Sequence, residues 1–303
     1  MTNFKIIQKR GVWLGVSAGL FVVCLAALMV WGLKLGIDFT GGSLLEVAFT
    51  GARPTVVQVE SGLADLKLGS LIIQPVGDKD MMLKFQETAE ETHQSILSRL
   101  NELAKKDNQN NSIEELRFES VGPSIGQELK IKSLWAIFFA LVAMLSYITY
   151  VFRKVSRPVA SWKYGTAAII AMFHDVVITM GVFAFLGHYY GIEINTAFVA
   201  AVLTVLGYSV HDSIVVFDRT RENLPKSNED FAGTVNISLN QTLVRSINTS
   251  LTSLLVLLAI IIFGGASIRT FVLALAVGIF IGTYSSIFVA SPLLVVWEKM
   301  GKK

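Results

Sequence analysis

The sequence predicts an α-helical membrane protein with six transmembrane helices and one α+β, ferredoxin-like domain between the first and second helices. Composition is the first reason: 52% of the residues are apolar, 16% are charged, and the mean hydropathy is +0.57. A series of apolar runs, each long enough to cross a bilayer, is the second. The third is a less hydrophobic segment, residues 34–133, in which strand and helix patterns alternate. The bilayer is thus the expected solvent, and no nucleic-acid partner is expected.

Six apolar runs give the expected membrane helices. The first has a basic flank, but it is longer than the roughly 7–15 apolar residues of a secretory signal, so a retained helix is expected. The polar stretch Phe231–Asn240 is expected to form an interfacial helix or loop, and the last run to tilt or kink near Pro292. The expected spans are Val12–Leu33, Leu134–Phe152, Tyr164–Leu186, Ala197–Phe217, Thr242–Phe263 and Thr270–Trp297.

Lysine and arginine residues gather in alternate connections between these runs. They precede the first run, lie between the second and third, follow the fourth, and close the chain. The positive-inside rule then predicts that both termini are cytoplasmic. Residues 1–35 are expected to hold the N-terminus and first helix, residues 36–132 the domain on the opposite side, and residues 133–303 the remaining helices. The single cysteine, Cys24, lies in the first run and excludes a disulfide within the chain.

The domain between the first two helices has the pattern βαββαβ. Alternating apolar residues indicate strands, and apolar residues at helical spacing indicate helices. The residues Gly77 to Asp80 (GDKD) have the composition of a hairpin turn. This order predicts a split, ferredoxin-like sandwich. The expected elements are strands at Ser43–Thr50, Leu71–Val76, Met81–Gln86 and Ile113–Val121 and helices at Thr55–Leu68 and Glu90–Lys106.

An acidic residue inside the fourth run, Asp212, is the main candidate for a functional group. A charged side chain at such a position costs on the order of 2.5–3.5 kcal/mol, so it indicates a function or a specific partner. The opposite charge of similar depth is Arg245 in the fifth run: Asp212 is about 7–8 Å and Arg245 about 5 Å from the cytoplasmic end. We therefore predict that the two side chains interact. The simpler alternatives are a snorkelling arginine and a purely structural ion pair.

Helical periodicity gives each of these residues polar neighbours. Tyr208 and Ser209 share a face with Asp212, whereas Arg245 belongs to a polar stripe that must face the bundle interior, a partner subunit or water. His174 and Asp175 form a second ionisable pair, deeper in the third run, and His211 precedes Asp212. Such a set resembles the composition of a proton relay. The stripe consists of Gln241, Arg245, Asn248, Thr249 and Thr252.

Glycine-containing motifs complete the pattern. Gly278 and Gly282 make a GxxxG in the last run, which predicts close helix packing. Three further motifs are GIDFTGG at residues 36–42, VGPSIG at residues 121–126 and GYSVHDSIVVFDRTREN at residues 207–223. Together these three motifs resemble the SecD/SecF family, within the resistance-nodulation-division superfamily, and the resemblance covers nearly the whole chain.

The resemblance implies a subunit that uses the proton-motive force to promote late stages of protein export across the bacterial inner membrane. It implies SecD, the SecYEG channel and YajC as partners, and polypeptides delivered by SecA as cargo. It also implies that Asp212 and Arg245 belong to the proton pathway, and that Asp38, Gly41 and Gly42 form a motif at the periplasmic mouth. His211 stands where the family pattern has asparagine. No enzymatic activity, cofactor or metal is expected.

Three other functions are weighed against this one. A proton-coupled efflux carrier of the same superfamily would share the helices, but the segment between the first two helices is small for a drug pocket. An intramembrane aspartyl protease could use Asp175 and Asp212, but the second acid follows Ser209-Val210-His211 rather than the GxG of such enzymes. A scaffold that only stabilises the channel would make no use of Asp212.

Overall fold

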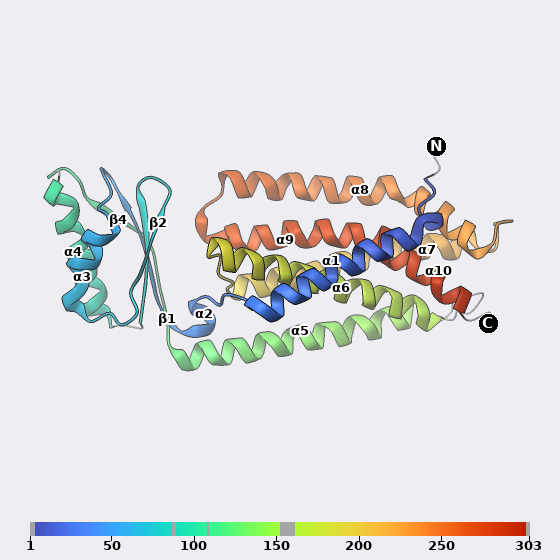
Figure 1. Cartoon of the computed structure of the whole chain (residues 1–303), viewed down its shortest axis with the longest axis horizontal. Helices are drawn as coiled ribbons and strands as arrows, with labels where there is room; N and C mark the ends of the chain where they lie inside the picture. The colour runs from blue at the N-terminus through green and yellow to red at the C-terminus, as the bar shows by residue number, and fades with distance from the viewer. Residues whose placement is uncertain (1–3, 87–88, 108, 152–160, 301–303) are drawn as a thin grey trace. The chain divides into compact units, whose positions relative to one another are not determined.

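The computed structural model describes residues 4–86, 89–107, 109–151 and 161–300. The chain forms two compact units. One consists of Met1–Lys34 and Leu134–Lys303, and the other of Leu35–Ser133. The first unit is helical and the second combines helices with a sheet (Figure 1).

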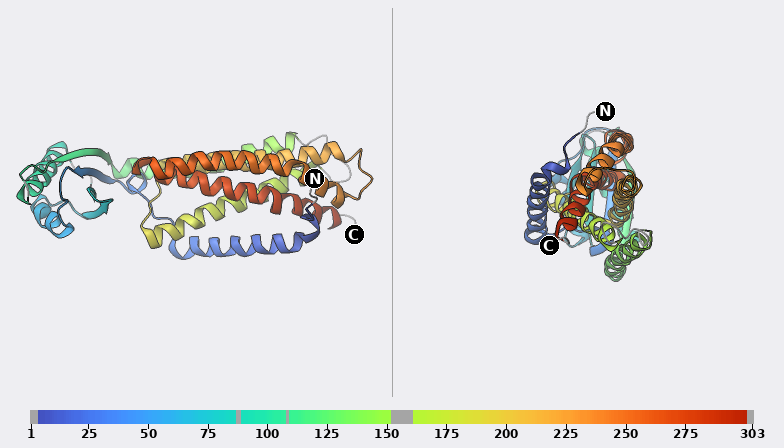
Figure 2. Two further views of the ribbon diagram at one scale, coloured as in Figure 1. Left: turned by 90° about the horizontal axis from the view of Figure 1, so that it is seen from above. Right: turned by 90° about the vertical axis from the view of Figure 1, so that its right-hand side faces the viewer.

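Six helical segments are long and apolar enough to cross a membrane, which confirms the predicted number. Two of them contain more than one helical element: a short 3-10 helix, η1, precedes α1, and the last segment contains α9, a π-helix and α10. The start of η1 and the end of α10 lie at the same end of the bundle (Figures 1 and 2). The elements are η1 (Ile7–Lys9), α1 (Arg10–Trp31), α5 (Pro123–Val151), α6 (Ser161–Tyr190), α7 (Thr196–Asn223), α8 (Phe231–Phe263), α9 (Ala266–Ser285), the π-helix η4 (Ser286–Ala290) and α10 (Ser291–Met300).

Helices α6, α7 and α9 form the centre of the bundle, which the right-hand view in Figure 2 shows end-on. In their apolar stretches 61%, 50% and 61% of the residues are buried, against 11%, 6% and 11% for α1, α5 and α8. The outer helices therefore present mostly apolar side chains to lipid or to a partner. Polar groups that avoid lipid must lie on the central helices or on the faces that pack against them.

Two helix boundaries differ from the expected ones. Residues Phe231–Asn240 form neither a separate interfacial helix nor a loop, because α8 runs without a break from Phe231 to Phe263. Asp230 caps its first turn by accepting a hydrogen bond from the backbone N–H of Gly233 at 2.7 Å. Helix α5 begins at Pro123, before the apolar run that starts at Leu134. In both cases hydropathy reports the apolar part of a helix, and the helix itself extends further; the predicted end at Phe152 lies outside the described residues.

A π-helix lies just before Pro292, near which the last run is predicted to tilt or kink. Proline has no N–H to donate to the carbonyl four residues earlier, so the regular ladder cannot continue through Pro292. The backbone widens over Ser286–Ala290, and the Ser291 hydroxyl donates to the Ser286 carbonyl at 3.0 Å. Such π-helical turns are frequent at functional sites.

The second unit has the predicted βαββαβ order. Its four strands form an antiparallel sheet in the order β2-β3-β1-β4, with the turn at Gly77 between β2 and β3. Figure 1 shows α3 and α4 together on one side of this sheet. The elements are α2 (Ile37–Thr40), β1 (Gly42–Phe49), α3 (Val56–Leu63), η2 (Ala64–Leu66), β2 (Ile72–Val76), β3 (Asp80–Phe85), α4 (Glu90–Asp107) and β4 (Ile113–Val121).

Alternation along the central strand β1 builds the core of this unit. Leu45, Val47 and Phe49 point to one face and are at most 1% exposed. They pack against apolar residues of both helices, including Leu63 and Leu100. A capping box between Thr55 and Gln58 fixes the start of α3. The pattern that predicted strands and helices is therefore the pattern that fills the core.

Candidate functional site

The carboxylate of Asp212 lies inside the helical bundle, on α7. The side chain is buried, and each of its oxygens accepts one hydrogen bond. Oδ1 accepts from the hydroxyl of Ser246 on α8 at 2.5 Å, and Oδ2 accepts from the hydroxyl of Ser286 in the π-helix at 2.6 Å. Asp212 was a candidate because burying a charged side chain is costly, and hydroxyl groups from two other elements hydrogen-bond to it.

Asp175 on α6 has a matching environment. It is completely buried, and its Oδ2 accepts hydrogen bonds from Ser209 of α7 at 2.5 Å and from Ser285 of α9 at 2.6 Å. Its Oδ1 lies 2.9 Å from Nδ1 of His174, whose ring stacks on Phe21. Nε2 of His174 is buried without a hydrogen-bond partner. Asp175 lies at the level of Ser209, about one helical turn from Asp212 along α7.

Apart from the His174 ring beside Asp175, these two acids are held by serine hydroxyls rather than by cationic side chains. Within the described parts of the chain, no lysine or arginine forms an ion pair with Asp175 or Asp212. A serine hydroxyl donates to an ionised carboxylate and accepts from a protonated one. The cage of serines therefore fits both protonation states of each acid, which a fixed cation would not do.

The predicted contact between Asp212 and Arg245 is wrong in this structure. Arg245 is exposed, and its neighbour Ser246 bonds Asp212 instead. Successive helical residues point about 100° apart, so equal depth does not place two side chains on the same face. Arg245 lines a groove of about 340 Å³ together with Asp218, Glu222 and other residues of α7 and α8.

The polar stripe on α8 faces outward, which is one of the arrangements left open above. Gln241, Arg245 and Asn248 are exposed, as are Thr249 and Thr252. The buried polar face of α8 includes instead Thr234, Ser238, Thr242, Ser246 and Ser250, spaced four residues apart. Sequence reasoning did not identify these residues, although the four-residue spacing was a usable signal.

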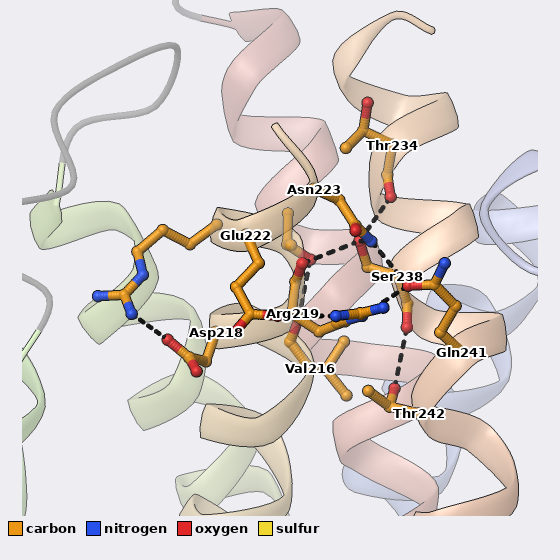
Figure 3. Close-up of polar contacts among 11 residues, drawn as sticks. Val216, Asp218, Arg219, Glu222, Asn223, Thr234, Ser238, Gln241 and Thr242 are labelled. Carbon is orange, nitrogen blue, oxygen red and sulfur yellow. Dashed lines mark hydrogen bonds and ion pairs between the residues drawn. The ribbon is translucent and has the colours of Figure 1, made fainter. Parts of the chain in front are cut away.

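A network of polar contacts joins α7 and α8 beside the Arg245 groove (Figure 3). Arg219 donates to Gln241 at 2.6 Å and to Glu222 at 2.7 Å. Asn223 donates to Ser238 at 2.8 Å and to Gln241 at 2.9 Å. The bond to Glu222 lies within α7, whereas the bonds to Gln241 and Ser238 cross to α8 and fix the two helices that carry Asp212 and Ser246.

The structure also shows where the other predicted site residues of the bundle, His211, Gly278 and Gly282, lie. His211 is exposed on α7, so the structure does not bring it to either carboxylate. Gly278 and Gly282 allow α9 to pack closely on α7, as the GxxxG motif predicted: a Cβ at Gly282 would lie 3.1 Å from Cβ of Ser209. No group of three histidine, cysteine, aspartate or glutamate side chains that could hold a metal occurs among the described residues.

The motif at Asp38, Gly41 and Gly42 lies at the start of β1 in the second unit. Gly41 has φ of +76°, and a Cβ there would lie 2.8 Å from Cα of Pro123. Gly42 has φ of +123°, and a Cβ would lie 2.9 Å from the carbonyl of Phe85. The two glycines therefore permit the approach of three chain segments, and the structure gives them a packing role.

Comparisons with known proteins agree with this architecture. Residues 101–300 match the family model described as protein export membrane protein SecD/SecF, C-terminal, and residues 27–52 match the SecD/SecF GG motif. A protein translocase subunit SecF from Thermobaculum terrenum is 46% identical over 283 residues, which cover 89% of this chain and 86% of that one. The SecF of Haemophilus influenzae is 39% identical over 96% of this chain and 84% of its own.

The crystal structure of SecDF from Thermus thermophilus, described as a translocon-associated membrane protein, is similar with a TM-score of 0.80 and 33% identity. The match covers 98% of this chain and 39% of the SecDF chain, so this chain spans about two fifths of that longer protein. These matches identify a transport protein rather than an enzyme, which excludes the intramembrane aspartyl protease weighed above. They give no support to the alternative of an efflux carrier. The chain belongs to the SecF subunits of the SecD/SecF family of protein-export membrane proteins.

Proposed function

We propose that this subunit, together with SecD, uses the proton-motive force to promote late stages of polypeptide export, and that Asp212 is the group that binds and releases the proton. The observation that carries the proposal is a buried carboxylate whose two oxygens accept only serine hydroxyls. A carboxylate inside a bilayer is costly, and one held by groups that fit both protonation states is suited to exchange a proton.

The groove beside Arg245 supports proton exchange between Asp212 and the side of the membrane that we propose to be cytoplasmic. It is lined by Asp218, Arg219 and Glu222, whose charges attract water, and Ser246 follows Arg245 directly in α8. A proton leaving Asp212 would pass the Ser246 hydroxyl before it reached this groove. Arg245 would then act as a fixed positive charge beside the exit rather than as a partner of the carboxylate.

Proton entry would bias the bundle between two packings. One elementary charge that falls through 100 mV supplies about 2.3 kcal/mol, which is enough to shift a conformational equilibrium but not to unfold a protein. Protonation changes the hydrogen bonds that join α7 to α8 and to the π-helix. The α+β unit would move with this change and act on the exported chain.

A partner subunit explains the outward polar stripe of α8. Lipid does not satisfy the polar side chains of Arg245 and Asn248, which are exposed in the isolated chain, whereas Gln241 and Thr249 already form hydrogen bonds within it. We assign this surface to SecD, and we propose SecYEG, YajC and SecA-driven polypeptides as the further partners. The setting is the bacterial inner membrane with both termini cytoplasmic and residues 36–132 periplasmic. His174, Asp175 and His211 are proposed to assist the proton pathway, the first two from inside the bundle.

The test is export into membrane vesicles that contain this subunit and wild-type SecD. Asp212→Asn should remove the component of export that depends on the proton gradient and leave the ATP-driven component intact. Asp65→Asn is the matched control, because Asp65 is an exposed acid that pairs with Arg99 at 3.4 Å and does not line the groove beside Arg245. Full proton-driven export by the Asp212→Asn protein would end the proposal.

A further inference from the structure

Two adjacent serines connect the two buried carboxylates. Ser285 ends α9 and Ser286 begins the π-helix, and both are completely buried. The Ser285 hydroxyl donates to Asp175 at 2.6 Å, and the Ser286 hydroxyl donates to Asp212 at 2.6 Å. A single peptide unit therefore links the hydroxyls that touch acids on α6 and α7.

Each of these hydroxyls has a second acceptor within reach. Oγ of Ser285 lies 3.1 Å from the carbonyl oxygen of Gly282, and Oγ of Ser286 lies 2.9 Å from that of Thr283. A hydroxyl carries one proton and two lone pairs. When the carboxylate is ionised, the serine donates to it. When the carboxyl is protonated, the serine accepts from it and turns its own proton to the helix carbonyl.

That rotation changes the hydrogen bonding of the backbone at a place where the helix is already irregular. Serine hydroxyls that bond to carbonyls of the preceding turn bend helices. The π-helix starts at Ser286, whose own carbonyl accepts from the Ser291 hydroxyl. The protonation state of either acid is thus transmitted to the same turn of the chain, where it alters the position of the other acid's donor.

We propose that Ser285 and Ser286 are positioning residues that couple the protonation of Asp175 to that of Asp212. The proposal rests on the proposed role of Asp212 in proton transfer and specifies how Asp175 takes part. The other titratable or charged groups near the pair are few among the described residues. His174 contacts Asp175, Tyr208 of α7 bonds Ser250, and Arg245 of α8 is exposed.

The test measures the coupling itself in the complex of this subunit with SecD. Infrared spectroscopy follows the carboxyl bands during a pH titration, and Asp175→Asn and Asp212→Asn assign them. With both serines present, Asp212→Asn should move the titration midpoint of Asp175 by about one pH unit, the scale on which two sites titrate as a pair. In Ser285→Ala and Ser286→Ala proteins the same replacement should move it by less than half as much.

Control variants separate coupling from packing. Ser213→Ala removes a buried hydroxyl of α7 that bonds neither acid and lies outside the π-helix, so it should leave the coupling unchanged. Ser286→Thr restores a hydroxyl and should restore the coupling. An undiminished shift in both alanine variants overturns the proposal, as does the absence of any carboxyl titration in the complex. Because the readout is spectroscopic, it is independent of the export assay. The proposed function fails if Asp212→Asn does not impair proton-driven export, even when the carboxyls are coupled. The coupling proposal fails if the serines do not affect the titration, even when Asp212→Asn impairs export.

Discussion

Replacing Gly278 by alanine should disturb the acid site from two helical turns away. A Cβ at this position would lie 2.9 Å from Cβ and 2.6 Å from Cγ1 of Val205 on α7. Carbon atoms pack best at about 3.5–4.0 Å, so α9 must move away from α7 by roughly 1 Å. The hydrogen bond from Ser286 to Asp212, now 2.6 Å, would lengthen to about 3.6 Å, which is no longer a hydrogen bond.

The stability cost follows from the same geometry. Overpacking of this kind typically costs about 1–3 kcal/mol. Gly19→Ala is the matched control, because a Cβ there meets nothing within 4 Å and the gain in helix propensity is the same. The complex with SecD carrying Gly278→Ala should therefore unfold more easily than the one carrying Gly19→Ala, by about 1–3 kcal/mol in a denaturant titration, and should lose proton-driven export.

A second substitution makes the prediction specific. Val205→Ala removes the methyl groups that the new Cβ would meet, so Val205→Ala combined with Gly278→Ala should regain much of the stability and export that Gly278→Ala loses. If Gly278→Ala behaves like Gly19→Ala, or if the double variant is no better than the single one, the close packing of α7 on α9 is not what positions Ser286.

Two further predictions concern the Arg245 surface and the α+β unit. In a cysteine-free background and without SecD, Arg245→Cys should react with a water-soluble thiol reagent and Ser246→Cys should not, because only the first is exposed; equal labelling would contradict the assigned faces of α8. Hydrogen bonds from Gln94, then from His93, lower the pKa of Glu90. Its contribution to stability is complete above the ordinary pKa and lost as the pH falls through the lower folded one. Gln94→Ala should therefore make α4 lose amide protection at higher pH during acidification, and an unchanged profile would refute this.

The fold was predictable because lipid and water each require a recognisable pattern of apolar residues in the sequence. Lipid requires long apolar runs, and the water-facing unit requires alternation such as that of Leu45, Val47 and Phe49. What hydropathy could not supply was the extent of each helix. Helix α8 continues through Phe231–Asn240 because backbone hydrogen bonding and the Asp230 cap do not depend on apolar character.

The candidate site was predictable in part for a related reason. Asp212 and Asp175 were identifiable because a buried acid is costly, whatever surrounds it. Their donors were not, because a serine can satisfy its hydroxyl on its own helix and so leaves almost no hydropathy signal. Depth suggested Arg245 as the partner, but depth fixes only one coordinate of a helical residue, and rotation about the helix axis selected Ser246.

The most direct measurement of the central claim is proton flux through the purified pair of this subunit and SecD in liposomes, followed with an internal pH-sensitive dye after a gradient is imposed. Asp212→Glu, which keeps a titratable carboxyl, should retain part of the flux, and Asp212→Asn should abolish it. Flux at the wild-type rate in the Asp212→Asn protein would contradict the assignment of Asp212 as the proton-binding group.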